Sequence, residues 1–167
     1  MGARMRKVIF DTNVLLDYFN ISCSEQDFKN AKALVTELWR SGSGFLVTPT
    51  TLKDLEYIMT ACLKRDILNE KGQIASEDAQ AIAALCQAAL DAVMEVGNVV
   101  SLGLADCRMA QTLMKTHGDY EDNLITAAAL RMGADCIVSR DGKFQRRCPV
   151  ACMDPAACLS SLQAGIF

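Results

Sequence analysis

The chain has 167 residues, of which 51% are hydrophobic and 22% charged, and its net charge is −3. This length suits one folded domain over residues 1–167, and the composition excludes a disordered chain. The acidic balance, with a pI of about 5.2, argues against a broad basic surface for nucleic acid, although it leaves room for a small basic patch.

The N-terminal stretch MGARMRK is basic but lacks the apolar segment of a signal peptide. The longest apolar runs are far shorter than the roughly 20 residues that a membrane span needs. We therefore expect a cytoplasmic protein without membrane contact. Residues 1–5 are expected to be disordered or to be an addition ahead of a natural start at Met5.

Cysteine and histidine usage argues against a zinc site. None of the eight cysteines forms a C-x-x-C pair, and most lie in apolar segments, which is typical of reduced thiols in a core. The single histidine, His117, has no cysteine at ligand spacing and no histidine partner. A zinc centre or a histidine-dependent nucleophile is accordingly not expected.

In chain order, short apolar strands alternate with helices. The turn residues 41–44 stop the first predicted helix, and a hydroxyl followed by proline at Thr48-Pro49 favours the start of the next. Ser76 is predicted to cap a long alanine-rich helix, and Gly133 to end a later one. The predicted strands are 7–11, 45–47, 99–102, 136–139 and 150–153, and the predicted helices are 27–41, 49–68, 76–96, 104–116, 119–132 and a short one from Pro155.

Wholly apolar strands separated by helices predict an α/β fold with a parallel sheet covered on both faces. In such sheets ligands bind beyond the carboxyl ends of the strands, where the strand order reverses. Polar residues that follow strands are therefore the candidates for a functional site. Four aspartates meet or approach this condition: Asp11, Asp54, Asp122 and Asp141.

Each aspartate also has a purely structural interpretation. Asp11 can cap a following helix, and Asp54 can be a solvated helix residue. Asp119 and Asp122 can cap their own helix, and Asp141-Gly142 can be a turn. Periodicity alone does not bring Asp122 to the carboxyl edge. If all four roles were purely structural, however, the four aspartates would have to lie close together by chance. That is less plausible than a purely structural role for any one of them.

Converging carboxylates repel one another and need a counter-cation. Oxygen ligands without histidine or thiolate favour Mg²⁺ or Mn²⁺, and such ions can activate water and stabilise a leaving oxygen in phosphodiester cleavage. Local cations would contact the phosphate backbone. Those that surround Asp141 are Arg140, Lys143, Arg146 and Arg147, although a solvated turn is an equally good interpretation of them.

Three segments resemble the PIN-domain family, in particular the bacterial toxin-like branch that includes VapC-type ribonucleases. They are VIFDTNVLLDYF, LVTPTTLKDLEYIM and GDYEDNLITAAALRMGADCIVSRDGKF, which together extend from about Val8 to Phe144. The resemblance implies a three-layer α/β/α domain with a central parallel sheet. It also implies a metal-dependent endoribonuclease, and the family's strand order brings the helix start at Asp122 to the rim.

Carried over by position, the resemblance makes Asp11, Asp122 and Asp141 catalytic residues and metal ligands for Mg²⁺ or Mn²⁺. Asn13 and Ser139 match polar residues that position the acids, a water or the substrate. Arg140 and Lys143 are the expected substrate contacts, and Asp119 is a possible fifth acid.

The second acid departs from the family pattern, which usually has glutamate about six residues after the strand-ending Ser or Thr. Counting from Thr48 gives Asp54, the fourth expected catalytic residue. Glu56 stays as the alternative, although it lies about 200° further around the helix.

The expected function is a ribonuclease that hydrolyses RNA phosphodiester bonds and is the toxin component of a type II toxin–antitoxin system. A small antitoxin and a second copy of the chain are the expected protein partners. One alternative is a phosphatase with Asp11 as nucleophile, but that chemistry usually needs an aspartate where Asn13 stands. The other is a PIN-like module that binds RNA or protein without catalysis.

Overall fold

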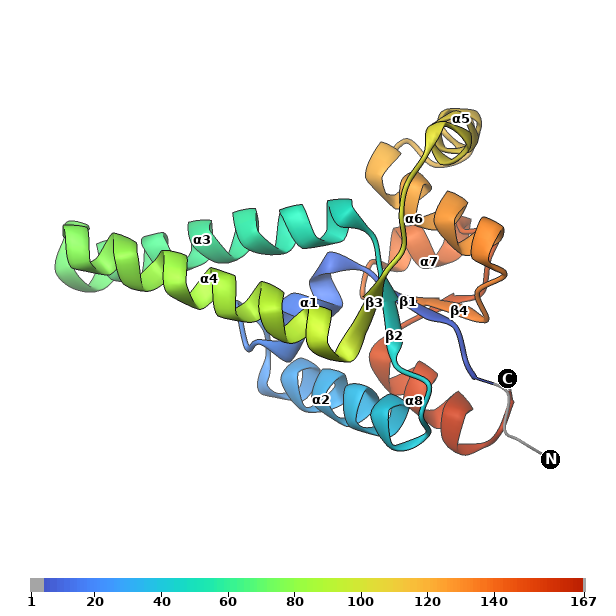
Figure 1. Cartoon of the computed structure of the whole chain (residues 1–167), viewed down its shortest axis with the longest axis horizontal. Coiled ribbons are helices and arrows are strands. Elements are labelled where there is room, and N and C mark those ends of the chain that lie inside the picture. Colours follow the sequence, from blue (N-terminus) through green and yellow to red (C-terminus); the bar gives the residue numbers. More distant parts are fainter. Residues whose placement is uncertain (1–4, 167) are drawn as a thin grey trace.

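The computed structural model describes residues 5–166, and within them five strands form one parallel sheet with helices on both faces (Figure 1). The strands are β1 (Val8–Phe10), β2 (Phe45–Val47), β3 (Gly97–Val99), β4 (Cys136–Val138) and β5 (Cys152–Met153), arranged in the order β3-β2-β1-β4-β5. All neighbouring strands run parallel. The predicted three-layer α/β/α fold is confirmed, whereas the expectation for residues 1–4 lies outside the described range.

The central strands bury both of their faces. Val8 and Phe10 point into one core cluster, whereas Ile9 between them points into the opposite one. In β4, Ile137 lies on the same side as Ile9. This alternation explains why the strands are continuous apolar runs in the sequence.

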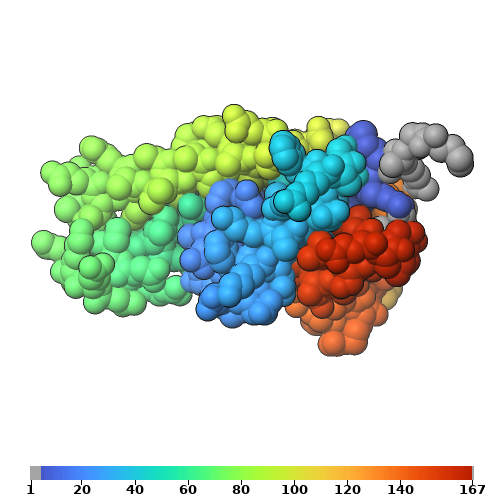
Figure 2. Space-filling model, turned by 90° about the horizontal axis from the view of Figure 1, so that it is seen from below, coloured from blue at the N-terminus to red at the C-terminus, as the bar shows by residue number. Residues whose placement is uncertain are grey.

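Helices on the two faces complete the layers. One face is covered by α1 (Thr12–Tyr18), α2 (Glu25–Arg40) and α8 (Pro155–Gln163), and α2 and α8 lie side by side at the surface in Figure 2. The other face is covered by α6 (Tyr120–Met132) and α7 (Gly142–Arg147), with α5 (Leu104–Leu113) packed on α6.

The helices α3 (Pro49–Lys71) and α4 (Ser76–Val96) pack against each other and extend well beyond the sheet as an arm (Figure 1). Met59, Ile82, Cys86 and Ala89 form a small core inside the arm.

Within residues 5–166, α4 is the one helix whose length and composition would allow it to cross a membrane. Soluble core helices and signal sequences pass the same test, so this is weak support for a membrane role.

Two short helices and one strand position differ from the sequence prediction. The helices α1 and α7 were not predicted as elements, although Asp11 and Asp141 were recognised as possible capping and turn residues, and each caps the helix that follows it. The third strand lies at 97–99 instead of 99–102, because Phe45 in the short β2 pairs with Gly97. A Cβ atom on Gly97 would lie 2.6 Å from the Phe45 ring, so the strand begins on the residue that permits this close approach.

Helix ends follow the predicted chemistry with one exception. Thr48 caps α3 with Pro49 as its first residue, and Gly133 ends α6 with a φ of 58°. Ser76 does not cap α4, because Ala75 occupies the N-cap position and its backbone amide donates to Asp78. All eight cysteines lie in the described range and are free thiols.

Candidate active site

The strand order reverses between β1 and β4. From β1 the chain builds the sheet outward through β2 and β3, and it then returns to add β4 and β5 on the other side of β1. Phe10 pairs with Val138, so the residues that follow, Asp11 and Ser139, leave the sheet next to each other. This is the place where open α/β sheets bind their ligands.

A hydrogen-bond network joins the ends of these two strands. The Ser139 hydroxyl donates to Asp11 Oδ2 at 2.6 Å, and Asn13 Nδ2 donates to the same oxygen and to Ser139 Oγ. The amide of Arg140 donates to Asn13 Oδ1 at 2.9 Å, and the amide of Asp141 donates to Ser139 Oγ at 3.0 Å. Asn13 and Ser139 therefore fix the orientation of Asp11 and of the loop that carries Asp141.

An acidic cavity of about 250 Å³ opens at this edge of the sheet. Carboxylates from four segments of the chain line it, together with Thr12, Asn13 and two apolar residues of α1 and α3. We call this hollow the acid cavity; its carboxylates are Asp11, Asp54, Asp119, Glu121, Asp122 and Asp141. The structure thus brings together the four aspartates that the sequence singled out, and their roles stay predictions.

Asp122 reaches the cavity because of the direction of its helix. Only three residues separate the end of α6 from β4, so the helix and the strand run in opposite directions. Near that turn the backbone amide of Asp135 donates to the Lys7 carbonyl, just before β1, so α6 ends at the amino edge of the sheet. A helix that ends there begins at the carboxyl edge, and the expectation that periodicity alone could not bring Asp122 there was wrong.

The structure distinguishes the two candidates for the second acid. Asp54 is buried on the inner side of α3 and lines the acid cavity, and its Oδ1 is paired with the ammonium of Lys53. Glu56 is exposed and accepts a long hydrogen bond, 3.4 Å, from Thr60 on the same helix. The cavity therefore contains Asp54 and not Glu56.

The start of α6 contributes two further carboxylates. Asp119 caps the helix, because its Oδ1 accepts from the amides of Glu121 and Asp122, and it lines the cavity at the same time. Glu121 was not predicted, and its Oε1 is buried without a hydrogen-bond partner. Its position directly before Asp122 in the sequence was the available indication.

Burial and charge change the acidity of three of these groups. Burial raises the pKa of Asp11, assisted by the charge of Asp141 and partly offset by the hydrogen bonds from Ser139, Thr12 and Asn13. Burial also raises the pKa of Asp122 to about 6, and the charges of Asp11 and Asp119 add to this. The pKa of Asp141 is lowered, mainly because the amide of Phe144 donates to its carboxylate.

The cavity gathers several carboxylates, and burial makes the ionised forms of Asp11 and Asp122 less favourable. Its donors are carboxylate oxygens, and this donor type fits Mg²⁺ or Mn²⁺. Within residues 5–166, however, no three His, Cys, Asp or Glu side chains already stand close enough to form a metal site. The chemistry of the donor set nevertheless fits a divalent ion.

The basic residues near Asp141 have different surroundings. The guanidinium of Arg140 is paired with Asp17, whose side chain is completely buried, and lies 3.7 Å from Asp27. Lys143 is exposed at the start of α7. A phosphate contact by Arg140 stays a prediction that must compete with these ion pairs, whereas Lys143 has no such competitor among the described residues.

His117, for which we predicted no role in the site, lies against the acid cavity. Its Nε2 is 2.6 Å from Asp122 Oδ2, and its side chain is buried. The spacing of five residues between them in the sequence did not indicate this contact, because a loop and a helix start intervene. The imidazole is therefore a partner of one of the candidate acids.

Comparison with known proteins agrees with this architecture. The family model described as PIN domain matches residues 7–143, which is most of the chain and includes Asp11, Asp54, Asp122 and Asp141. No curated protein sequence matches the chain.

Solved structures share the fold at low sequence identity. VapBC2 from Rickettsia felis, bound to a promoter DNA fragment, is 15% identical, with a TM-score of 0.57 over 89% of this chain and 98% of that one. A toxin–antitoxin complex from Klebsiella pneumoniae is 15% identical, with a TM-score of 0.58 over 89% and 97%. PAE2754 from Pyrobaculum aerophilum is 14% identical, with a TM-score of 0.59 over 98% and 94%. The family model matches most of the chain, and the fold and the site agree with it, so the chain belongs to the PIN domain family.

Proposed function

We propose that this protein is a metal-dependent endoribonuclease that hydrolyses RNA phosphodiester bonds. The observation that carries the proposal is the acid cavity, in which carboxylates from four separate segments meet at the switch point of a PIN-domain sheet. Such a concentration of desolvated negative charge costs stability unless a cation offsets it. It is therefore expected at a site that binds one.

In this proposal Asp11, Asp122 and Asp141 hold Mg²⁺ or Mn²⁺, and Asp54 assists from α3. When bound, the ion supplies a Lewis acid that favours attack by water and stabilises developing negative charge. Asn13 and Ser139 keep the Asp11 carboxylate oriented through the hydrogen bonds described above. Lys143, exposed at the rim, is the expected contact for an RNA phosphate.

The residue at position 13 argues against Asp11 as a phosphatase nucleophile. Its Oδ1 accepts from the Thr12 amide at 2.6 Å, and its Oδ2 accepts from Ser139 and Asn13. These bonds orient the carboxylate and leave a lone pair free, so they do not decide the question, but Asn13 stands where such enzymes usually carry an acid. Failure to trap a phospho-aspartate would agree with this conclusion.

A PIN-like module without catalysis is the second candidate. It is favoured by the lack of a ready-made group of three metal-binding side chains among residues 5–166. The two candidates differ in what divalent ions do. A ribonuclease must bind Mg²⁺ or Mn²⁺ in the acid cavity, whereas a binding module gives a flat metal titration.

The test is the Asp11→Asn substitution, assayed for RNA cleavage with Mn²⁺. We expect cleavage to fall by at least about 100-fold. Loss of a residue that only supports a metal ligand typically costs about 10- to 100-fold, and Asp11 is proposed to bind the ion itself. The fold is expected to persist, because the amide keeps the size of the side chain and removes a desolvated charge. Cleavage at the wild-type rate would refute the proposed mechanism.

A protein partner belongs to the same proposal. Two solved structures with this fold are VapBC2 and a toxin–antitoxin complex, which supports a small antitoxin as a partner of this chain. A homodimer is a further proposed partner. The described surface offers exposed apolar residues for them on the arm and on α5, among them Leu85, Met94, Leu104 and Met109. A toxin of this kind would act in the cytoplasm, where its RNA substrate is found.

A further inference from the structure

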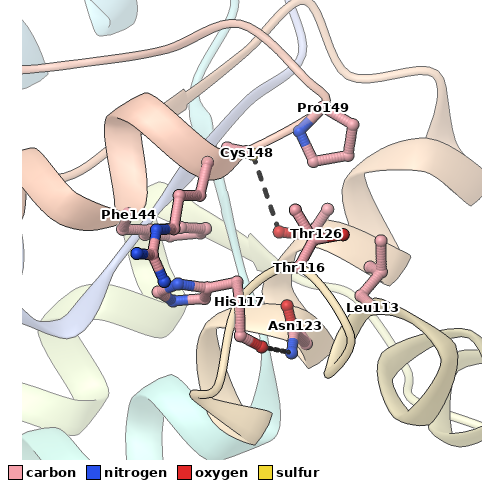
Figure 3. Close-up of a pocket in the computed structure, with 9 residues that line it drawn as sticks. Leu113, Thr116, His117, Asn123, Thr126, Phe144, Cys148 and Pro149 are labelled. Atoms are coloured by element: carbon pink, nitrogen blue, oxygen red, sulfur yellow. Dashed lines mark hydrogen bonds between the residues drawn. The ribbon is translucent and has the colours of Figure 1, made fainter.

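His117 is the one histidine of the chain, and it lies between the two helices that support Asp122 and Asp141. Its backbone carbonyl accepts from Asn123 Nδ2 at 2.7 Å, a bond drawn in Figure 3, and Asn123 follows Asp122 in α6. Its ring stacks on Phe144 of α7 at 5.6 Å between centroids and 13° between planes. The imidazole therefore has little freedom to turn.

The hydrogen-bond network assigns the tautomer of the neutral ring. Nε2 faces Asp122 Oδ2 at 2.6 Å, whereas Nδ1 is buried and has no partner among the described residues. A buried N–H without an acceptor is rarer and more costly than an unused lone pair. The proton is thus assigned to Nε2, and this N–H donates a hydrogen bond to Asp122 Oδ2.

The hydrogen bond from His117 occupies Oδ2 of Asp122 and leaves Oδ1 available. Oδ1 accepts no hydrogen bond from residues 5–166, and it is not one of the buried unpartnered atoms. Asp122 also lines the acid cavity, whereas His117 does not. On its other side the ring borders a separate pocket of about 70 Å³, shown in Figure 3, so the ring forms part of the wall behind Asp122.

We propose that His117 is a positioning residue that holds the Asp122 carboxylate in the orientation needed to bind a divalent ion. This inference rests on the proposed function, since it assumes that the acid cavity binds such an ion. Ligating carboxylates in metal sites are themselves commonly hydrogen-bonded, and loss of such a partner typically weakens metal binding about 10- to 100-fold. His117 acts through Asp122 and does not touch the substrate.

The experiment compares His117→Phe with His117→Gln by calorimetric titration of the full chain with Mn²⁺. Phenylalanine keeps the stacking on Phe144 and removes the donor, and we expect it to weaken Mn²⁺ binding about 10- to 100-fold. Glutamine can place an N–H near the position of Nε2, so we expect it to restore most of the affinity. At saturating Mn²⁺ the cleavage rate of both variants should approach that of the wild type.

A second measurement does not depend on cleavage. Because the sequence has one histidine, ¹⁵N-histidine labelling of protein without a polyhistidine tag reports on His117 alone. We expect the Nε2 resonance to shift on addition of Mg²⁺, saturating as the site fills, and this response to vanish in Asp122→Asn. If His117→Phe does not fold, the resonance experiment and the His117→Gln variant still test the positioning role.

The outcomes separate this inference from the proposed function. Wild-type protein that binds Mn²⁺ while His117→Phe binds it equally well overturns the positioning role and leaves the ribonuclease proposal intact. Equal weakening in the phenylalanine and glutamine variants also overturns it, because the hydrogen bond would then not be the cause. Wild-type protein that binds no Mn²⁺ overturns both.

Discussion

At the residue scale, the same side chains have structural and proposed chemical roles. Asp11 caps α1 through the Thr12 amide and also lines the acid cavity. Asp119 and Asp141 likewise cap helices while facing that cavity. Capping and metal binding are therefore compatible here, because a carboxylate with two oxygens can accept an amide proton and still offer lone pairs to a cation.

The raised pKa of Asp122 predicts a pH-dependent stability. Its folded-state pKa of about 6 exceeds the ordinary value of 3.8, so the folded chain binds more protons than the unfolded chain between these values. The contribution of Asp122 to stability therefore falls as pH rises through about 6, by on the order of 2–3 kcal/mol in total. Thermal unfolding of the metal-free protein at about pH 4 and about pH 7.5 measures most of this change.

The control for this prediction is Asp122→Asn, which should lose that part of the pH dependence. Mg²⁺ should raise the unfolding midpoint of the wild type more at the higher pH, where Asp122 is ionised. Parallel pH curves for the wild type and Asp122→Asn would contradict the assignment.

Asp54 and Glu56 provide a matched pair on one helix. Asp54 is buried at the cavity, and Glu56 is exposed and points elsewhere. We expect Asp54→Asn to lower the rate of RNA cleavage about 10-fold or more and Glu56→Gln to leave it unchanged. A cleavage assay at fixed Mn²⁺ decides, and the opposite ranking would make Glu56 the second acid.

At the scale of elements, an ion pair ties the β4–α7 loop to α1. Arg140 follows Ser139 in this loop, and its guanidinium pairs with the completely buried Asp17 of α1. Burial raises the pKa of Asp17 to about 6 although Arg140 opposes this, so the carboxylate depends on its partner. The pair links the loop that carries Asp141 to the helix that follows Asp11.

This arrangement predicts different effects for the two basic residues of the loop. Arg140→Met should destabilise the fold by about 3 kcal/mol in denaturant unfolding, because it leaves a buried charge unpaired. The double variant with Asp17→Asn should recover much of that loss.

Lys143→Ala should leave stability unchanged and weaken RNA binding, and an unchanged affinity for RNA would remove Lys143 from the substrate site.

The sequence predicted the long elements better than the short ones. Continuous apolar runs and capping pairs such as Thr48-Pro49 located four strands and the long helices to within a few residues. The short helices α1 and α7 have too few residues to show a helical period, so only their caps were visible. The third strand shifted because its start depends on pairing with Phe45, which is a tertiary contact.

The candidate site was predictable where chemistry and strand ends coincide. Asp11 and Asp141 follow strands directly, and the parallel-sheet rule brought them together. His117, Glu121 and the pairing of Arg140 with Asp17 were not predictable, because each depends on packing between segments distant in the fold or on the orientation of one side chain.

At the scale of the whole molecule, the arm formed by α3 and α4 leaves apolar residues without cover. A groove lined by Phe19, Ile21, Met59, Leu63 and Leu85, with two alanines of α4, runs along it. Leu85 is 53% exposed. A contiguous exposed apolar surface is one mark of a protein interface.

We therefore expect Leu85→Lys to reduce self-association or antitoxin binding, measured by sedimentation velocity of the chain alone and with a candidate antitoxin. Gln87→Lys is the control, because Gln87 is exposed on the same helix and does not line the groove. Equal association of both variants would show that the groove is not the interface.

Anomalous diffraction from crystals soaked in Mn²⁺ shows whether the acid cavity binds a divalent ion. We expect a manganese peak inside the cavity, with oxygens of Asp11, Asp122 and Asp141 around it, and no such peak in crystals of Asp11→Asn. A wild-type map in which manganese is absent from the cavity, or binds only elsewhere on the surface, would contradict it.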